Sequence, residues 1–513
     1  MVEGMGRALR AIAWVGPIAF MGLFFYFPLS RILTRAVSAN SLAAIFRPEV
    51  GAVVWFTLWQ ALASIAICLA IGLPMAFLLY RRSFFGSKLI RSLLAVPFVL
   101  PTIVVAIALA PIRGLPGWLA ILVANAFLNI SVIVRMVGSV WASIDSNLDS
   151  SAQMDGATTL ATILRVHLPI LRAAIFNASV LVFLYCVTSF GIVLVFGGSQ
   201  YQSIETMIYF ALNNRLNLNL VGGLALIQTV VTVVAFALAK PTRIENSSAE
   251  MYSPVKRASL PEVFAFFAFV AVFFAFPIFT ILVNGLTITN LTNLSSLGSR
   301  ELLDIPVWQA IANSVRNAFV ATVLAVTVGT LVARLSHRHR WTHFWFILPL
   351  GISSVLLGFG FLVSFGAGLF PFEYSWLVVP IVQAVLAIPL VVQQMIGAQN
   401  LVPLEIIEAA SNAGANRWQS WWQIEMPVII GPLRNSISFA FLVSIGEFGA
   451  ASLLSYGNQA TLPIVLYRLI SRPGGENYGM AMAAASLIIL LAFAVVAITS
   501  LDRKQRRLYS TAM

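Results

Sequence analysis

Charged residues are scarce in this sequence, where Asp, Glu, Lys and Arg together make up 10% of 513 residues. Soluble globular domains carry about a quarter charged residues, so the composition excludes an ordinary soluble enzyme. Apolar residues make up 60% of the chain and its mean hydropathy is +0.93, which also excludes a disordered chain. Because a membrane span needs about 20 apolar residues, the chain has room for about a dozen spans.

Cysteine is also rare, and both copies, Cys68 and Cys186, lie within apolar stretches. This position indicates small buried side chains rather than a disulfide. Acidic residues number 18 against 31 basic ones, a net charge of +13. In a membrane protein such an excess is explained by orientation, because cytoplasmic loops collect Lys and Arg. We therefore expect no nucleic-acid partner.

Long apolar segments occur six times before a polar stretch and six times after it. They fall at about 11–30, 53–80, 89–110, 118–137, 174–196 and 221–239, and then at about 263–283, 310–334, 344–366, 375–394, 435–454 and 479–500. This pattern predicts an all-α polytopic membrane protein with about 12 transmembrane helices. It divides the chain into a first repeat, 1–239, a cytoplasmic linker, 240–262, and a second repeat, 263–513.

The distribution of basic residues indicates on which side of the membrane each loop lies. If the N-terminus is inside, 22 of the 31 Lys and Arg residues fall on the inner side, including the cluster Arg503–Arg507 after the last span. The opposite orientation would reverse this ratio. Both termini are therefore expected to be cytoplasmic, in a multi-pass protein surrounded by membrane lipid.

The two halves are related by a constant offset of 258 residues. The matches are Gly156 with Gly414, Ala157 with Ala415, Pro169 with Pro427, Phe190-Gly191 with Phe448-Gly449, and Tyr209 with Tyr467. With six spans each, the halves have the same orientation in the membrane. We expect a pseudo-two-fold axis along the membrane normal, with the transport pathway between the halves.

Each half carries a helix, a glycine turn and a second helix in one inner loop. The candidate residues are Ala152, Asp155, Gly156, Leu168 and Pro169 in loop 150–169, and Glu408, Ala409, Ala410, Gly414, Ile424 and Pro427 in loop 408–427. Glycine permits the positive φ that ends the first helix, and proline is expected to end the second. Small residues allow another protein to approach closely, and Trp418, Trp421 and Trp422 offer anchors.

Loop 408–427 resembles the EAA loop of ATP-binding cassette importer permeases. Loop 150–169 keeps Ala152, Gly156, Leu168 and Pro169 of this pattern but has Ser150 in place of the glutamate. This difference puts its charged contact with a partner in doubt, but not its docking role. The resemblance implies two six-helix repeats of the type I importer fold. It also implies two copies of a cytoplasmic ATPase, one seated on each loop, and a periplasmic or lipid-anchored substrate-binding protein. The alternative for a single loop is an amphipathic connector without a partner.

The sequence contains no G-x-x-x-x-G-K-[ST] loop to hold phosphates. The chain is therefore not expected to be an enzyme or to bind a cofactor, and a partner subunit would use the ATP. No G-x-S-x-G or H-E-x-x-H motif occurs. His337, His339 and His343 have a metal-like spacing, but Arg338 and Arg340 between them favour a solvated basic loop without a metal.

A narrower resemblance covers most of the chain. The stretches 79–86, 196–209 and 444–467 are similar to thiamine importer permeases, whose ferric-iron relatives share the fold and the loops. The resemblance implies transport of thiamine or its phosphate esters across a prokaryotic inner membrane, with ferric iron as the alternative. A secondary transporter is a further alternative, but the EAA loops and the scarcity of membrane acids argue against it.

Glu447 is the one acidic residue expected within a span, and its counterpart in the first half is Ser189. A carboxylate in a membrane is costly and indicates a pathway or a specific partner. Either Glu447 and Ser189 line a substrate pathway, where Glu447 would attract a cation, or Glu447 bonds a neighbouring helix or caps a helix break beside Gly446 and Gly449. The sequence leaves both interpretations open.

Overall fold

The structure is a computed structural model. It describes residues 14–510 except 95, 98–99, 111–113, 214–216, 239–255, 337–341, 367–375, 400–401, 403 and 473. Most of the predicted linker 240–262 therefore lies outside the described residues, as do His337 and His339.

The chain forms two compact units. Unit 1 comprises 1–45, 208–226 and 285–513, and unit 2 comprises 46–207 and 227–284. The packing thus differs from a simple division at the linker. The described part of 1–45, the start of the first predicted repeat, belongs to unit 1, which the second repeat mainly forms. Residues 263–284, the start of the second repeat, belong to unit 2, which the first repeat mainly forms. The repeat boundaries at 1–239 and 263–513 remain a prediction, and these packing units do not coincide with them.

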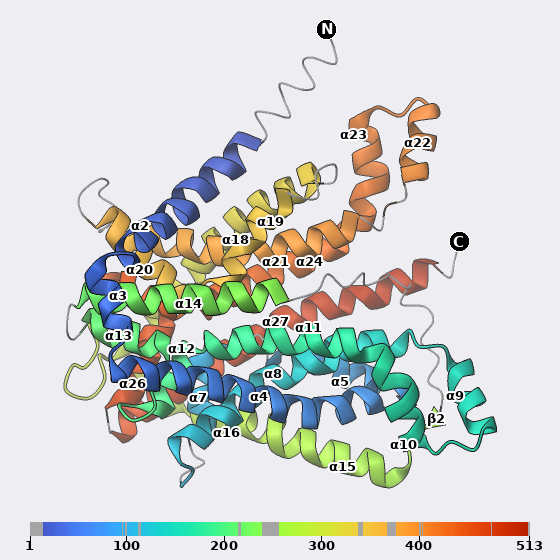
Figure 1. The fold of residues 1–513 in the computed structure, drawn as a ribbon, viewed down its shortest axis with the longest axis horizontal. Helices are drawn as coiled ribbons and strands as arrows, with labels where there is room; N and C mark the ends of the chain where they lie inside the picture. Colours follow the sequence, from blue (N-terminus) through green and yellow to red (C-terminus); the bar gives the residue numbers. More distant parts are fainter. Residues whose placement is uncertain are drawn as a thin grey trace. The chain divides into compact units, whose positions relative to one another are not determined.

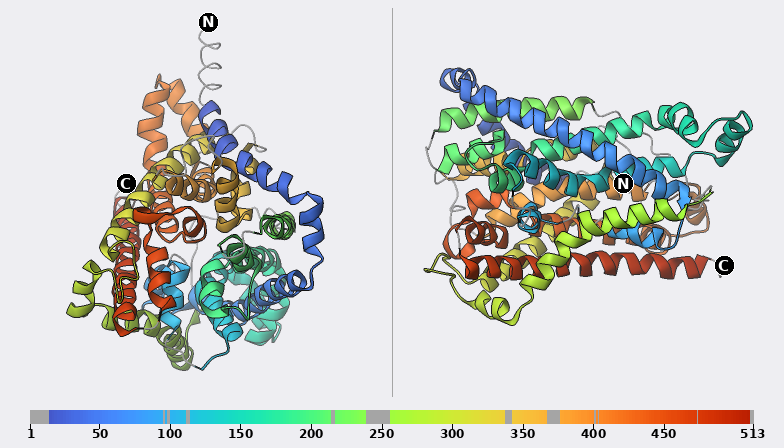
Figure 2. Two further views of the ribbon diagram at one scale, coloured as in Figure 1. Left: turned by 90° about the vertical axis from the view of Figure 1, so that its left-hand side faces the viewer. Right: turned by 90° about the horizontal axis from the view of Figure 1, so that it is seen from below.

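Unit 2 is built on three long helices, α4 (Pro48–Arg81), α8 (Gly117–Ala142) and α11 (Leu168–Val187). Figures 1 and 2 show them running side by side along their lengths. The other elements are α5 (Ser87–Leu93), α7 (Thr102–Leu109), α9 (Ser146–Met154), α10 (Thr159–Thr162), η2 (Ile163–His167), α12 (Phe190–Gly197), α15 (Leu260–Val270) and η3 (Ala271–Ala275). A two-residue parallel pair joins β1 (Arg82–Ser83) to β2 (Lys256–Arg257).

Unit 1 has an equivalent core of α18 (Val307–Ser336), α21 (Val378–Gln399) and α24 (Met426–Ile445). The other elements are η1 (Gly22–Tyr26), α2 (Phe27–Ala36), α3 (Ala39–Ile45), α17 (Ile288–Thr292), η4 (Asn293–Ser295), α19 (Thr342–Ile347), η5 (Leu348–Gly351), α20 (Ser354–Phe365), α22 (Leu404–Asn412), α23 (Arg417–Ser420), η7 (Trp421–Glu425), α25 (Gly449–Leu454), η8 (Gly457–Gln459), α26 (Leu462–Ser471) and α27 (Gly475–Ser510). Helices α13 (Ile204–Asn213), α14 (Leu218–Leu238) and α16 (Phe276–Gly285) contribute residues to both units.

The internal repeat is visible in the secondary structure. The π-helical turns η2 and η7 begin at 163 and 421, and the helices α11 and α24 begin at 168 and 426, in both cases 258 residues apart. The fold therefore confirms an all-helical chain of two repeats. The axis that relates the repeats remains a prediction.

Close helix packing is also repeated. A Cβ added to Gly72 on α4 would lie 2.8 Å from Ile133 of α8, and one added to Gly329 on α18 would lie 2.6 Å from Val391 of α21. Gly72 and Gly329 are 257 residues apart, one fewer than the π-helical turns η2 and η7, whereas their contact partners Ile133 and Val391 keep the offset of 258. Glycine at these points allows two membrane helices to approach closely.

Among the described residues, ten helices are long and apolar enough to cross a membrane, or eleven if one bent pair is counted as a span. This count, made over the described residues, agrees with the prediction of a polytopic protein of about 12 transmembrane helices. The predicted span 89–110 is interrupted, since α7 restarts after Pro101. The predicted span 344–366 bends by 110° before α20, because Pro349 lies in a 3₁₀ turn and Ser353 caps the new helix.

The predicted inner loops are also shorter than expected, because their second helices continue into spans. Pro169 and Pro427 do not end these helices, which run from Thr159 to Val187 and from Trp418 to Ile445. Each proline follows a π-helical turn, in which the N–H of Leu168 or Met426 donates five residues back. The wider turn accommodates a proline that has no N–H and whose ring would clash in a regular helix.

We expect Gly72→Val to destabilise the packing of α4 against α8 by about 1–3 kcal/mol, because the larger side chain would overlap Ile133. Thermal unfolding of the purified protein in detergent measures this effect. Gly51→Val, on the same helix but with no atom within 4 Å of the added Cβ, is the matched control. Equal melting temperatures for the two variants would contradict the assigned packing.

Candidate coupling loops

The first candidate loop is an exposed helical hairpin in unit 2, termed elbow 1 (residues 145–167). Asp145 caps α9 by accepting the N–H of Asn147 at 2.9 Å, and Gly156 ends it with φ +79°. The N–H of Ala157 then donates to the Ala152 carbonyl at 2.9 Å, which closes a Schellman turn. Thr158 starts α10, so the glycine reverses the chain as predicted.

The second loop, elbow 2 (residues 404–425), has the same construction in unit 1. Gly414 has φ +85°, and the N–H of Ala415 donates to the Ala410 carbonyl at 2.9 Å. Asn416 and Gln419 cap the next helix by exchanging side-chain and backbone hydrogen bonds. Figure 1 shows each helix changing direction between its elbow and the following long helix, from α10 to α11 and from α23 to α24.

The surface of both elbows is accessible. Of the predicted residues, Asp155, Gly156, Leu168, Pro169, Glu408, Ala409, Gly414 and Pro427 are exposed, whereas Ala152, Ala410 and Ile424 are half-buried. Large apolar side chains are also exposed, with Met154 at 89% and Trp418 at 66%. Exposed apolar groups beside small residues are typical of a protein-docking surface. Whether these residues contact an ATPase remains a prediction.

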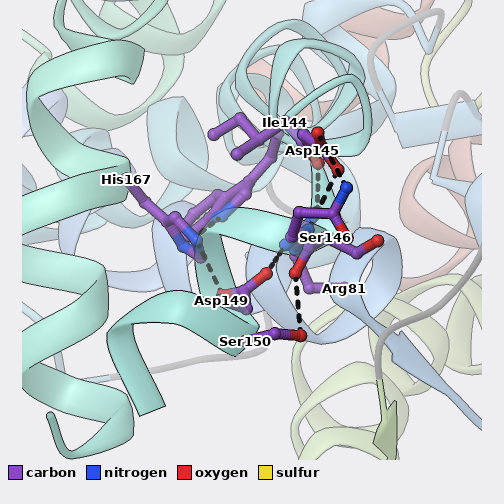
Figure 3. A network of polar contacts seen from close by, with 9 residues as sticks. Arg81, Ile144, Asp145, Ser146, Asp149, Ser150 and His167 are labelled. Atoms are coloured by element: carbon purple, nitrogen blue, oxygen red, sulfur yellow. Dashed lines mark hydrogen bonds and ion pairs between the residues drawn. The ribbon is translucent and has the colours of Figure 1, made fainter. Parts of the chain in front are cut away.

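Elbow 1 is fixed to its unit by a buried polar network (Figure 3). Asp149, 7% exposed, forms an ion pair with Arg81 at the end of α4. His167 Nε2 lies 3.0 Å from the other carboxylate oxygen, and its Nδ1 accepts the Trp141 indole N–H at 3.0 Å. Because an indole can only donate, the imidazole proton is on Nε2, the nitrogen nearer Asp149. Arg81 also donates to the Ile144 carbonyl at 2.7 Å.

Elbow 2 contacts its unit differently. The guanidinium of Arg334, near the end of α18, lies 5.4 Å from the ring centre of Trp421. Trp418, Trp421 and Trp422 contact one another, with ring centres 5.0–5.8 Å apart. A cation–π contact of this kind stabilises by about 0.5–1 kcal/mol at an exposed site. The two elbows thus share a backbone but not their side-chain contacts.

Glu447 lies between α24 and α25 and is 8% exposed. Its carboxylate accepts the backbone N–H groups of Ala450 and Ala451 at 2.7 and 3.1 Å. These are donors at the start of a helix, which have no partner inside the helix. The geometry matches the interpretation that Glu447 caps a helix break, and the pathway role remains a prediction.

Ser189 occupies the equivalent break between α11 and α12 and is also buried. Its hydroxyl donates to Asn125 at 3.1 Å, and Asn125 donates to Gln60 at 2.7 Å. Gln60 in turn donates to the Cys186 carbonyl at 2.8 Å, near the end of α11. The first half therefore supports its break with neutral amides and a hydroxyl where the second half uses a carboxylate.

Several buried polar residues were not predicted from the sequence. Asp149 and Arg81 are 68 residues apart, and no local pattern connects them. Glu205 is fully buried in the first turn of α13 and accepts a hydrogen bond from Gln228 at 3.2 Å. Its position after Ser203, a residue typical of helix starts, is the only local signal. Within the described part of the chain no three His, Cys, Asp or Glu residues cluster as a metal site.

We expect Glu447→Ala to destabilise the protein by about 0.5–2 kcal/mol, the usual effect of removing a helix cap. Glu447→Gln keeps one acceptor oxygen and should lose less, and melting temperatures compare the two. Uptake by Glu447→Gln tests the pathway role separately. If Glu447 lines the pathway, uptake falls while ATPase binding is intact; unchanged uptake would rule this role out.

Comparisons with known proteins agree with this geometry. The sequence pattern of the family described as binding-protein-dependent transport system inner membrane component matches residues 68–240 and 325–507, one copy in each half. The chain is 28% identical to a thiamine transport system permease protein of Haemophilus influenzae, covering 92% of this chain and 93% of that protein. For the Escherichia coli K12 protein with the same description the values are 24%, 86% and 88%.

A shorter relative matches one half. The molybdenum transport system permease protein of Escherichia coli K12 is 30% identical over 38% of this chain and 93% of its own length. The two family matches cover more than half of the 513 residues and include both elbows. The chain belongs to the family of binding-protein-dependent transport system inner membrane components.

Proposed function

We propose that this protein is the membrane subunit of a thiamine importer driven by a separate ATPase. The observation that carries the proposal is the pair of exposed elbows with the same glycine turn, 258 residues apart, in a chain of the binding-protein-dependent family. The chain itself performs no chemistry, and it binds no cofactor. Both termini and both elbows are on the cytoplasmic side of a prokaryotic inner membrane.

Each elbow binds one copy of the ATPase. Elbow 2 presents Glu408 together with the tryptophan group, and elbow 1 presents Met154 and the exposed face of α9. Each elbow is a separate docking site, and one ATPase domain bound there would fill it. Two equivalent elbows therefore bind two ATPase copies. The ATPase supplies the energy, since the sequence has no loop for phosphates.

In the transport cycle, the pair of ATPase subunits alternates between an open arrangement and a closed, ATP-bound arrangement. When ATP binding closes the ATPase pair, the elbows move with it, and the helices that continue from them into the membrane change position. This favours the outward-open arrangement, which receives the ligand from a substrate-binding protein on the outer side. Hydrolysis and release return the inward-open arrangement. A ligand or partner shifts such an equilibrium only by its differential affinity for the two states.

Thiamine, or one of its phosphate esters, is the proposed substrate because the full-length relatives are described as thiamine permeases. Ferric iron is the alternative. Uptake of labelled thiamine in vesicles loaded with ATP and supplied with the cognate binding protein tests the substrate. Competition by excess unlabelled thiamine, and none by ferric citrate, is the expected result. No ATP-dependent uptake of labelled thiamine, together with uptake of labelled ferric iron in the same vesicles, would assign the iron substrate.

We expect Gly414→Asp to release the ATPase from the detergent-solubilised complex. An L-residue at φ +85° is strained by about 1–2 kcal/mol, and the added carboxylate lies on the docking surface. Copurification of the ATPase with the affinity-tagged chain measures the effect. Gly397→Asp adds the same side chain at an exposed helical position with no close neighbour and should retain the ATPase.

The same preparation distinguishes the other class of transporter. ATPase that remains bound to Gly414→Asp at the wild-type amount would contradict docking at elbow 2. Proton-driven uptake in vesicles without ATP would establish a secondary transporter instead.

A further inference from the structure

The two elbows carry carboxylates at adjacent positions of otherwise equivalent helices. Glu408 on α22 is exposed, and its counterpart on α9, 258 residues earlier, is the exposed Ser150. The carboxylate of α9 is instead one residue earlier, at Asp149, whose counterpart is Ile407. One residue is about 100° of helix rotation. Glu408 therefore faces outward, while Asp149 faces the unit and is buried.

Each oxygen of the buried carboxylate lies near a basic side chain. Arg81 pairs with one oxygen, and His167 Nε2 lies 3.0 Å from the other. Arg81 also holds the Ile144 carbonyl, and His167 is oriented by Trp141. These residues come from the end of α4, from α8 and the residues after it, and from the turn before α11. Figure 3 shows Arg81 and His167 converging on Asp149.

The network is buried, since the side chains of Arg81 and Asp149 are 5% and 10% exposed. The adjoining cavity, lined by Phe77, Arg81, Asp149 and His167 among others, has a volume of about 30 Å³, which has room for water because one molecule needs about 10–15 Å³ by this measure. A buried ion pair with both partners hydrogen-bonded keeps one geometry, and removing one partner leaves an uncompensated charge. The network therefore links elbow 1 to α4 as well as to the helix that continues from it.

We propose that Asp149 is a positioning residue that fastens elbow 1 to helix α4, so that movement of the elbow also moves α4. The two elbows then use their carboxylates differently. Asp149 of elbow 1 binds residues of its own chain, whereas Glu408 of elbow 2 faces the ATPase. The role of this contact in transport rests on the proposed function. The attachment of elbow 1 to α4 through Asp149 does not depend on it.

A spin label on Met154→Cys, at the exposed end of α9, tests the fastening directly. Cys68 and Cys186 are buried and would not compete for the reagent. In the full-length protein we expect Asp149→Asn to increase label mobility. Asp155→Asn, which removes the same charge from an exposed position on the same elbow, should leave the spectrum unchanged. Equal spectra for the two variants and the parent would overturn the proposal.

Transport per ATP hydrolysed provides the second measurement. Asp149→Asn should retain the ATPase but lower this ratio about fivefold or more, the scale of a typical coupling energy between sites. Glu408→Gln should instead reduce the amount of bound ATPase without changing the mobility of the elbow 1 label. An unchanged ratio in Asp149→Asn would show that α4 need not follow the elbow and would overturn the coupling role.

If the Asp149→Asn protein does not fold in sufficient amount, a milder variant can be measured instead. Arg81→Lys keeps the charge but loses the planar fork with which Arg81 reaches both Asp149 and the Ile144 carbonyl, so it should raise label mobility by a smaller amount. The two proposals fail separately. No ATPase on the unmodified chain would contradict the proposed function, whereas an unchanged label would contradict only the fastening.

Discussion

In a hydrocarbon environment, every backbone N–H and C=O group must find a partner within the protein, and this fold meets that demand at several points where a helix is disturbed. The four π-helical turns in the described part of the chain, η1, η2, η3 and η7, are each followed after one residue by proline. The wider turn shifts the hydrogen bonds around a residue that cannot donate. Where helices break completely, Glu447 accepts N–H groups at the start of α25 in one half, and Gln60 adds a hydrogen bond to the Cys186 carbonyl near the end of α11 in the other.

The same backbone carries different side chains in the two halves. Trp59 and Trp118 contact each other with ring centres 5.8 Å apart. At the corresponding positions, 257 and 258 residues later, the guanidinium of Arg316 lies 4.6 Å from the ring centre of Trp376. Ser189 and Glu447 differ in the same way. Duplication thus preserved glycine contacts and turns, which depend on backbone geometry, while charge was distributed unequally.

Features that depend on local backbone geometry could be predicted from the sequence. Gly156 and Gly414 end their helices with positive φ, as expected, because other residues rarely adopt it. Prolines were misleading, since whether Pro427 ends or bends a helix depends on the turn before it, and apolar periodicity does not reveal a π turn. The ion pair of Arg81 with Asp149 could not be predicted, because it joins residues from separate elements that only the folded chain brings together.

The long helices that follow the elbows have one further consequence. Helices α11 and α24 contain 20 residues each, which corresponds to about 30 Å, the thickness of the hydrocarbon layer. Each bend at a proline is therefore separated from the break at Ser189 or Glu447 by about one membrane thickness. The prolines of the elbows and the capped breaks thus mark the two ends of one membrane-spanning helix in each half, so a displacement of an elbow has a rigid segment of this length to act on.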